Sequence, residues 1–302
     1  MTERELAHTI PATATSDGAG VRLRRSIGTA RGIDVDPFLM LDEFSSDDPD
    51  DYIAGFPNHP HRGFETVTYM LDGHMLHQDH MGNRGDLGPG GVQWMTAGRG
   101  IIHSEMPQQQ NGRMRGFQLW INLPAAEKMK PAAYRDIPAA DIPEIRPSGG
   151  GTVRLIAGQL SIDDERYSGA INTAGGMSTD PLYADIVLAP GQAFSAPVSA
   201  SHRAIIYLYE GAARIGNPSE AVGNERQMLQ PHSAGVLGNG DRISIRAGQN
   251  GCRALLLAGK AIGEPVVQYG PFVMNSRAEI EQAIRDYQSG RLTAEPSLRQ
   301  SS

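Results

Sequence analysis

The chain has 302 residues and a formal net charge of −7, and its 36 Gly and 20 Pro indicate many turns between short elements. Hydrophobic residues make up 39% and charged residues 20%, which excludes a disordered chain and predicts a folded protein of two domains at this length. The acidic balance, with lysines only at positions 128, 130 and 260, argues against a broad nucleic-acid-binding surface, because phosphate binding needs clustered basic side chains.

The sequence contains no segment typical of export or membrane attachment. Its first ten residues, MTERELAHTI, are charged and include no apolar run, and the longest apolar stretches are far too short to cross a bilayer. The single cysteine, Cys252, cannot form an intrachain disulfide, which suits a reducing compartment. We therefore expect a cytoplasmic protein that contacts neither a membrane nor nucleic acid directly.

The first half has the pattern of an antiparallel all-β domain. Between residues 21 and 123, apolar runs are short, rich in Val, Ile, Tyr and Phe, and interrupted by Gly, as at 65–71 (ETVTYML) and 116–123 (GFQLWINL). The stretch 138–151, PAADIPEIRPSGGG, follows neither the helix nor the strand period, and its Pro residues and Gly triplet indicate a linker. We predict an N-terminal domain over residues 1–148 and a C-terminal domain over residues 149–302.

The second half repeats the pattern of strands and turns. YMLDG at 69–73 resembles YLYEG at 207–211, and RGFQL at 115–119 aligns with RALLL at 253–257, so both matches share an offset of 138 residues. Two matches at one offset favour a tandem duplication of one β-domain.

One helix is expected, near the end of the chain. Ser276 precedes Glu279 by three positions, which is the spacing of a capping box, and Ile280, Ile284 and Tyr287 follow at helical spacing. This pattern predicts a tail helix over about 276–289 that lays its apolar stripe on a barrel.

Two short motifs carry candidate metal ligands. His59 and His61 are two positions apart, so in a strand their side chains leave the same face roughly 6.5 to 7 Å apart. His103 and Glu105 repeat this geometry, and Glu65 also lies on the face of His61 if the strand stays regular. If the two segments become neighbours, they form a mixed nitrogen and oxygen site that suits iron, nickel, copper, manganese or zinc and leaves positions open for catalysis.

Other histidines give weaker signals, and each motif also has a structural interpretation. Solvent-facing or hydrogen-bonded pairs are the alternative for the two motifs, although Gly turns flank both of them. His74, His77 and His80 recur at every third position and cannot converge on a strand, so we interpret them as a polar surface or pocket rim, with Asp79 as a hydrogen-bonding partner of His77. A buried, inert thiol is the expected state of Cys252.

The segments 55–73 (GFPNHPHRGFETVTYMLDG) and 90–107 (GGVQWMTAGRGIIHSEMP) resemble the two metal-binding motifs of the pirin family in the cupin superfamily. The resemblance continues at 37–44 (PFLMLDEF) and 269–275 (YGPFVMN). It implies an all-β bicupin, in which two antiparallel β-barrels of jelly-roll type stand in tandem and only the first barrel binds metal. With the tail helix predicted above, the expected fold is two tandem cupin barrels and a short C-terminal helix.

The same resemblance implies the ligand set His59, His61, His103 and Glu105 around Fe(II), with Ni, Mn, Co, Cu or Zn as alternatives. Other cupins use a carboxylate in the place of Glu65, which in a pirin becomes a supporting residue. The offset of 138 carries the four implied ligands to positions that cannot hold a transition metal, namely Pro197, Ser199, Asp241 and Ile243.

The implied activity is that of a quercetin 2,3-dioxygenase, which opens the central ring of a flavonol with O2 and releases carbon monoxide. In that reaction, Glu105 would act as the general base that takes the proton of the flavonol 3-hydroxyl. Phe56, Trp94 and Met95 are the expected pocket residues, and we expect a monomer. The alternative function is that of an iron-binding, redox-sensitive regulator that acts on a transcription factor or a metabolic enzyme.

Overall fold

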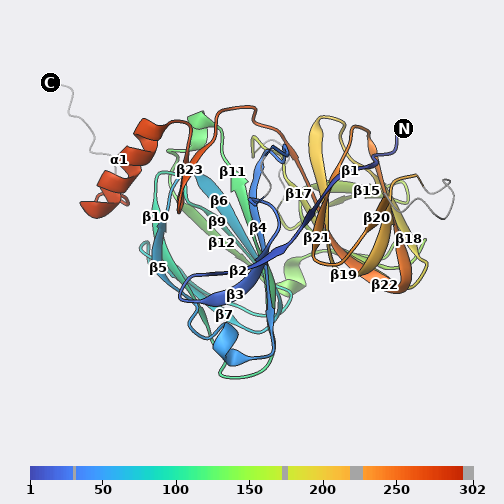
Figure 1. The fold of residues 1–302 in the computed structure, drawn as a ribbon, viewed down its shortest axis with the longest axis horizontal. Coiled ribbons are helices and arrows are strands. Elements are labelled where there is room, and N and C mark those ends of the chain that lie inside the picture. The colour runs from blue at the N-terminus through green and yellow to red at the C-terminus, as the bar shows by residue number, and fades with distance from the viewer. Residues whose placement is uncertain (30–31, 172–175, 218–226, 295–302) are drawn as a thin grey trace.

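The computed structural model describes residues 1–29, 32–171, 176–217 and 227–294. Most of these residues lie in antiparallel strands that form two β-structures side by side, the N-terminal one built mainly from the first half of the chain (Figure 1). A short helix, α1 (Arg277–Gln288), follows near the C-terminus. The predicted fold class of two tandem cupin barrels with a C-terminal helix is confirmed. Within the described residues, no helix is both long and apolar enough to span a membrane.

The first barrel combines two sheets. In the described ranges, one sheet has seven strands in the order β12-β9-β6-β11-β4-β3-β2, and the other has four in the order β5-β10-β7-β8. The strands are β2 (Thr13–Asp17), β3 (Val21–Arg25), β4 (Phe38–Ser46), β5 (Phe56–His61), β6 (Phe64–Asp72), β7 (Met75–Asp79), β8 (Arg84–Leu87), β9 (Val92–Thr96), β10 (Ile101–Pro107), β11 (Met114–Asn122) and β12 (Ala133–Ile137). Short 3-10 helices lie at Pro49–Asp51, Ala125–Glu127 and Ala139–Asp141.

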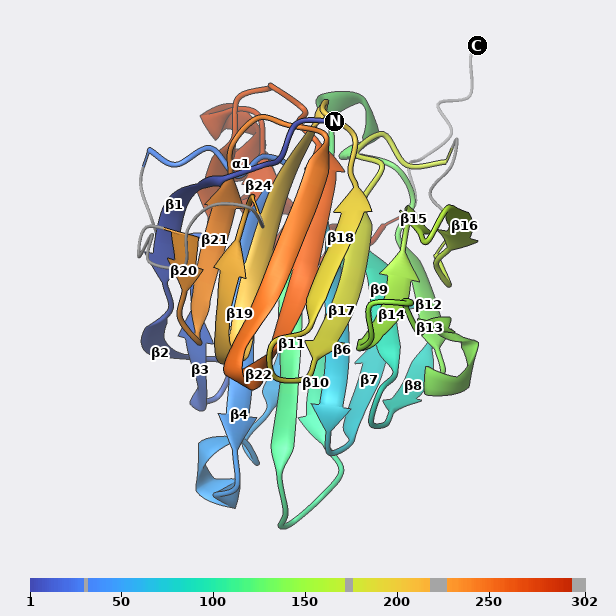
Figure 2. The same ribbon diagram turned by 90° about the vertical axis from the view of Figure 1, so that its right-hand side faces the viewer.

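The second barrel is organised around two long strands, β19 and β22, which pair with each other and bend at register shifts (Figure 2). Its sheet runs β1-β21-β19-β22-β17-β14-β13, with β18 on β22 and β20 on β19. The bounds are β1 (Leu6–Pro11), β13 (Glu144–Ile145), β14 (Thr152–Ala157), β17 (Leu182–Leu188), β18 (Ala193–Pro197), β19 (His202–Ile215), β20 (Met228–Leu229), β21 (Ser233–Leu237) and β22 (Arg242–Lys260). A separate hairpin joins β15 (Gln159–Ile162) to β16 (Glu165–Ser168).

Both ends of the chain cross to the opposite barrel. Strand β1 pairs with β21 in the second barrel, whereas β23 (Val267–Tyr269), β24 (Phe272–Met274) and α1 return to the first. There the Val273 N–H donates to the Arg62 carbonyl at 3.1 Å, and Arg62 pairs with Asp286 of α1 at 2.8 Å. Figure 1 accordingly shows α1 beside β5 and β10. The domain boundary predicted between residues 148 and 149 stays a prediction. Each terminal segment packs on the barrel formed mainly by the other half of the chain.

The predicted cap of the tail helix is present, and its predicted apolar stripe is present in part, because Ile280 is buried and Ile284 partly buried whereas Tyr287 is exposed. The Ser276 side chain accepts a hydrogen bond from the Glu279 N–H, and the helix buries Ile280 and Ala283. These two side chains pack with Phe272 and Met274 of β24, and the cluster also touches β10. The helix therefore covers the strand that carries one of the two predicted ligand pairs.

The offset of 138 residues appears as a shared pairing register. Val67 lies opposite Leu119 in the β6–β11 pair, and Ile205 lies opposite Leu257 in the β19–β22 pair. These four side chains belong to one hydrophobic core, so the duplicated sheets pack against each other. The shared register supports the duplication that the sequence indicates.

Lys128 ties the crossing segment to the first barrel and yields a stability prediction. Its buried ammonium donates to the carbonyls of Gly63 and Val273 at 2.7 and 3.0 Å and to Asn122 Oδ1 at 2.6 Å. Lys128→Met leaves three buried acceptors without their donor, so we expect a loss of about 3 kcal/mol in the free energy of unfolding, measured by urea denaturation. A loss below about 0.5 kcal/mol, the range of ordinary surface substitutions, would contradict this role.

Burial also lowers the pKa of Lys128 to about 8, from 10.5. Between these two values, the unfolded chain holds a proton that the folded chain has released, so a rise in pH favours folding. We expect the stability of the wild type to increase relative to that of Lys128→Met as the pH rises from 8 to 10, in paired denaturation curves. If the stability difference between the wild type and Lys128→Met stays constant or shrinks over this pH range, burial does not lower the pKa of Lys128.

Candidate metal centre

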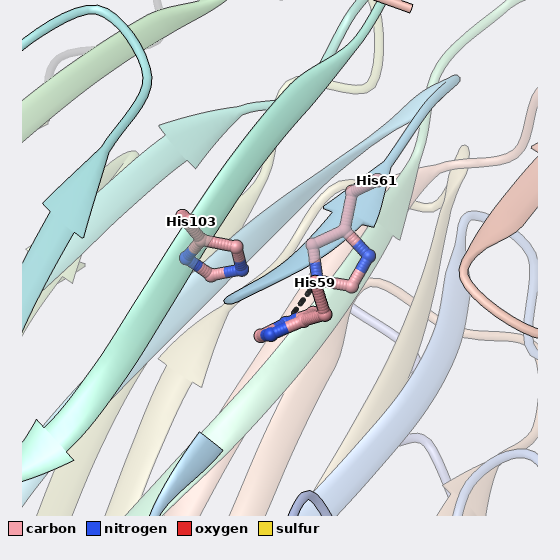
Figure 3. Close-up of side chains that lie close together, drawn as sticks. All are labelled: His59, His61 and His103. Carbon is pink, nitrogen blue, oxygen red and sulfur yellow. Dashed lines mark hydrogen bonds between the residues drawn. The ribbon is translucent and has the colours of Figure 1, made fainter. Parts of the chain in front are cut away.

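Two neighbouring strands bring three histidines together in the first barrel. His59 and His61 lie on β5, His103 lies on β10, and the antiparallel register places His103 opposite His59. The ligand nitrogens of the three side chains all lie within 4.8 Å of one another, with 3.0 Å between the Nε2 atoms of His59 and His61 (Figure 3). In the part of the chain that the structure describes, this is the group of His, Cys, Asp and Glu side chains with a spacing that could hold a metal ion.

The three imidazoles suit a divalent transition metal in their protonation state as well as their spacing. Burial lowers the pKa of His61 and His103 well below 6.5, and the neighbouring histidines lower it further. Both rings are therefore neutral at pH 7, with a lone pair available for a metal. The Nε2 of His103 is buried and has no hydrogen-bond partner among the described residues. A metal ion would satisfy this atom, so the residues fit the ligand role that the sequence predicts for them.

The lowered pKa values predict how the metal-free protein responds to acid. Below pH 6.5, the unfolded chain binds protons at positions 61 and 103, whereas the folded chain does not, so stability is lost as the pH falls. We expect wild-type protein to lose more stability between pH 7.5 and 5.5 than His61→Gln does, in urea denaturation with a chelator present. Equal losses in the two proteins would contradict the prediction.

A second pair of side chains continues from His103 away from the cluster. Strand β7 pairs with β10 on the side opposite β5, which brings His77 Nδ1 to 3.4 Å from His103 Nδ1. His77 Nε2 in turn lies 3.4 Å from Asp79 Oδ2, and the ring of Tyr134 stacks on His77 at 4.3 Å. With Asp79 accepting from His77 and His77 accepting from His103, the lone pair of His103 Nε2 faces the cluster.

The sequence interpretation of His77 as a surface or rim residue is wrong, because its side chain is 2% exposed. The predicted contact with Asp79 is present. A usable signal was in the sequence, since His77 and Asp79 are a third pair at the spacing that puts two side chains on one strand face.

Glu105 lies near the cluster and is held in place by two neighbours. Its Oε1 accepts from Thr68 Oγ1 at 2.8 Å, and its Oε2 accepts from Gln118 Nε2 at 3.0 Å. The side chain is buried on β10 and lines the same pocket as His59 and His61, but it is not part of the group within 4.8 Å. Its role as fourth ligand therefore stays a prediction.

The carboxylate of Glu65 accepts hydrogen bonds from side chains outside the histidine cluster. It is buried and accepts hydrogen bonds from Thr96 Oγ1 at 2.7 Å, Trp94 Nε1 at 3.2 Å and Lys130 Nζ at 3.4 Å. These donors belong to β9 and to the segment after β11, so Glu65 connects parts of the barrel and does not line the pocket.

His59 and His61 line a cavity of about 590 Å³, a size typical of small-molecule sites. Its apolar wall contains the predicted Phe56, whereas Trp94 and Met95 lie outside it. On one side, Arg25 forms a two-pronged ion pair with Asp42 at 2.7 Å and also reaches Asp17 at 2.8 Å. The other lining side chains are mainly apolar or amide, and include Leu23, Met40, Phe44, Asn58, Gln118 and Trp120.

The equivalent positions of the second barrel are apolar. In the second barrel, Ala196 pairs with Ile243 in the position that the His59–His103 pair has in the first barrel. Likewise, Ile215 pairs with Ile245 in the position of the His77–Glu105 pair. All of these second-barrel side chains are buried in its hydrophobic core. The set expected from the offset of 138 (Pro197, Ser199, Asp241 and Ile243) is displaced by one or two residues, because these strands pair in a different register. The structure therefore fills with aliphatic groups the space that holds imidazoles in the first barrel.

Comparisons with known proteins agree on one family. Residues 20–121 match the model of the family described as Pirin, and residues 183–293 match that of the Pirin C-terminal cupin domain. A Pseudomonas aeruginosa protein named "Putative quercetin 2,3-dioxygenase" is 52% identical over 92% of this chain and 94% of its own length. Human pirin is 42% identical, over 91% of this chain and 89% of its own length.

A solved structure supports the same assignment. The crystal structure of a quercetin 2,3-dioxygenase from Acinetobacter baumannii aligns with a TM-score of 0.83 and 32% identity, and the alignment covers 96% of this chain and 98% of that one. With two matching domain models, close relatives over most of its length and the histidine cluster in the first barrel, this chain belongs to the pirin family.

Proposed function

We propose that this protein is a metal-dependent dioxygenase that cleaves a flavonol such as quercetin with O2 and releases carbon monoxide. The observation that carries the proposal is a cluster of three histidines, of which His61 and His103 are buried and neutral, while His59 and His61 line a largely apolar cavity of about 590 Å³. The names of the Pseudomonas and Acinetobacter relatives support the same activity. The single buried cysteine supports a cytoplasmic location as part of the proposal.

In this proposal, His59, His61, His103 and Glu105 hold Fe(II). The metal supplies a Lewis acid that lowers the pKa of the substrate hydroxyl. Glu105 accepts the proton of that hydroxyl, while Thr68 and Gln118 keep its carboxylate pointed at the pocket. Phe56 and Trp120 provide apolar wall area for a flat aromatic substrate and keep water from it.

The proposal is tested by reconstitution. The metal-free protein is loaded anaerobically with Fe(II), or separately with Ni, Mn, Co, Cu or Zn, and then receives quercetin and O2. We expect the flavonol absorption to disappear and carbon monoxide to be released in equal amount. If the protein binds each metal fully and shows no turnover with any of them, the dioxygenase proposal is wrong. The alternative from the sequence, an iron-binding regulator, would then remain.

Glu105→Gln tests the role of the carboxylate separately. The amide keeps the shape of the side chain but cannot accept the substrate proton, so we expect kcat to fall about 100-fold or more. Metal content measured on the same samples distinguishes the two roles, because loss of the ion would identify Glu105 as a ligand. An unchanged kcat with full metal content would contradict both roles.

A further inference from the structure

A second cavity of about 480 Å³ lies in the second barrel and shares no lining residue with the metal pocket. Its walls come from the β15–β16 hairpin, the segment before β17, the end of β18 and the facing ends of β19 and β22. These elements are far apart in the sequence, so the cavity depends on the folded barrel.

The cavity lies at the end of β18, and the corresponding end of β5 in the first barrel carries the candidate metal ligand His61. Strand β18 occupies the place of β5, and Val198 follows Ala196 as His61 follows His59. The Val198 side chain, together with Leu182, gives this cavity a buried apolar floor. The duplicated barrel has thus kept an opening at this end with an aliphatic group in place of the imidazole.

Two cations line the cavity without a carboxylate partner. Neither Arg166 nor Lys260 has an Asp or Glu oxygen within 4.0 Å in the parts of the chain that the structure describes. Arg166 donates a hydrogen bond to Gln159, which also lines the cavity. Two cations at one cavity, neither with a carboxylate partner among the described residues, favour an anion as its ligand.

The remaining polar groups do not cancel this charge. Asp180 is the acidic residue of the lining, and its carboxylate faces His202 Nε2 at 3.4 Å. Burial lowers the pKa of His202, which leaves a neutral imidazole in the wall. With two cations against one carboxylate, and one imidazole where a metal needs several ligands, the cavity suits an organic anion better than a metal ion.

We propose that this second cavity binds a small aromatic carboxylate. The guanidinium of Arg166 and the ammonium of Lys260 receive the carboxylate, since Arg offers paired donors that match its two oxygens. Val198 and Leu182 supply the apolar contact for the ring, which an inorganic anion would not use. This site does not depend on the proposed dioxygenase activity or on a metal in the first barrel.

The test is isothermal titration calorimetry with benzoate and, separately, inorganic phosphate. We expect benzoate to bind with a Kd below about 1 mM and the double variant Arg166→Gln/Lys260→Gln to bind it at least tenfold more weakly. The control is Arg277→Gln, which removes a largely exposed guanidinium on α1 and should leave the Kd unchanged. Both variants alter exposed side chains, so both should fold.

Three results of these titrations would overturn the proposal, and a control on a further variant could overturn it as well. The three results are the absence of benzoate binding up to about 5 mM, a double variant within twofold of the wild type, and phosphate binding as tight as that of benzoate, which would identify a general anion site. Repeating the titration on His103→Ala protein separates this site from the metal pocket, because an unchanged Kd locates the benzoate away from the histidines. A Kd that rises with loss of His103 would assign the binding to the first barrel and contradict the second site.

Discussion

His103→Ala is expected to lower the affinity of the protein for Fe(II) by more than about 100-fold. Residues that only support a metal ligand typically cost 10- to 100-fold when they are replaced, so removal of a ligand itself should cost more. His103 is the decisive position, because it is the contribution of β10 to the three-histidine group and its Nε2 has no hydrogen-bond partner in the described ranges. Without His103, both remaining histidines of the cluster would come from one strand, β5.

The measurement is elemental analysis of protein purified without a chelating tag, followed by titration of metal-free protein against a competing chelator. The matched control is His74→Ala, because this histidine lies on the turn before β7 with about half of its side chain exposed. We expect the control to bind metal as the wild type does. A His103→Ala protein that keeps its metal would show that the cluster is a hydrogen-bonded group without a ligand role.

The two pairs of candidate ligands were predictable because each pair depends on local geometry. Alternation along a strand puts His59 and His61 on one face whatever the rest of the fold does, and the same holds for His103 and Glu105. The meeting of the two pairs was conditional on β5 and β10 becoming neighbours, which the antiparallel register establishes. The tail helix was equally local, since its cap and stripe lie within about fifteen residues.

Features that depend on pairing between segments far apart in the sequence could not be predicted from local spacing. The crossing of β1 to the second barrel, and of β24 and α1 to the first, needs partners more than 200 residues away. The spacing of His77 and Asp79 places both side chains on one strand face, but that this face points inward depends on the pairing of β7 with β10. The displaced counterparts of the ligands have a similar cause, because a register shift between His103 and Glu105 changes how many residues separate equivalent positions.

His77→Phe is expected to weaken Fe(II) binding about 10- to 100-fold while leaving the three histidines in place. The substitution removes the acceptor that faces His103 Nδ1 but keeps a ring against Tyr134. Without that acceptor, the proton of His103 is free to move to Nε2, where it blocks the lone pair that faces the cluster. Asp79 keeps hydrogen bonds from Asn83 and Met81, so its carboxylate is not left unpaired.

His77→Gln is the informative companion, because its amide oxygen can accept from His103 where the phenyl ring cannot. We expect His77→Gln to recover most of the lost affinity in chelator competition, and Gln78→Ala, on the exposed face of the same strand, to match the wild type. A purely structural role for His77 predicts instead that the affinity follows thermal stability across the three variants. If His77→Phe binds metal as tightly as the wild type, the contact with His103 has no part in holding the ion.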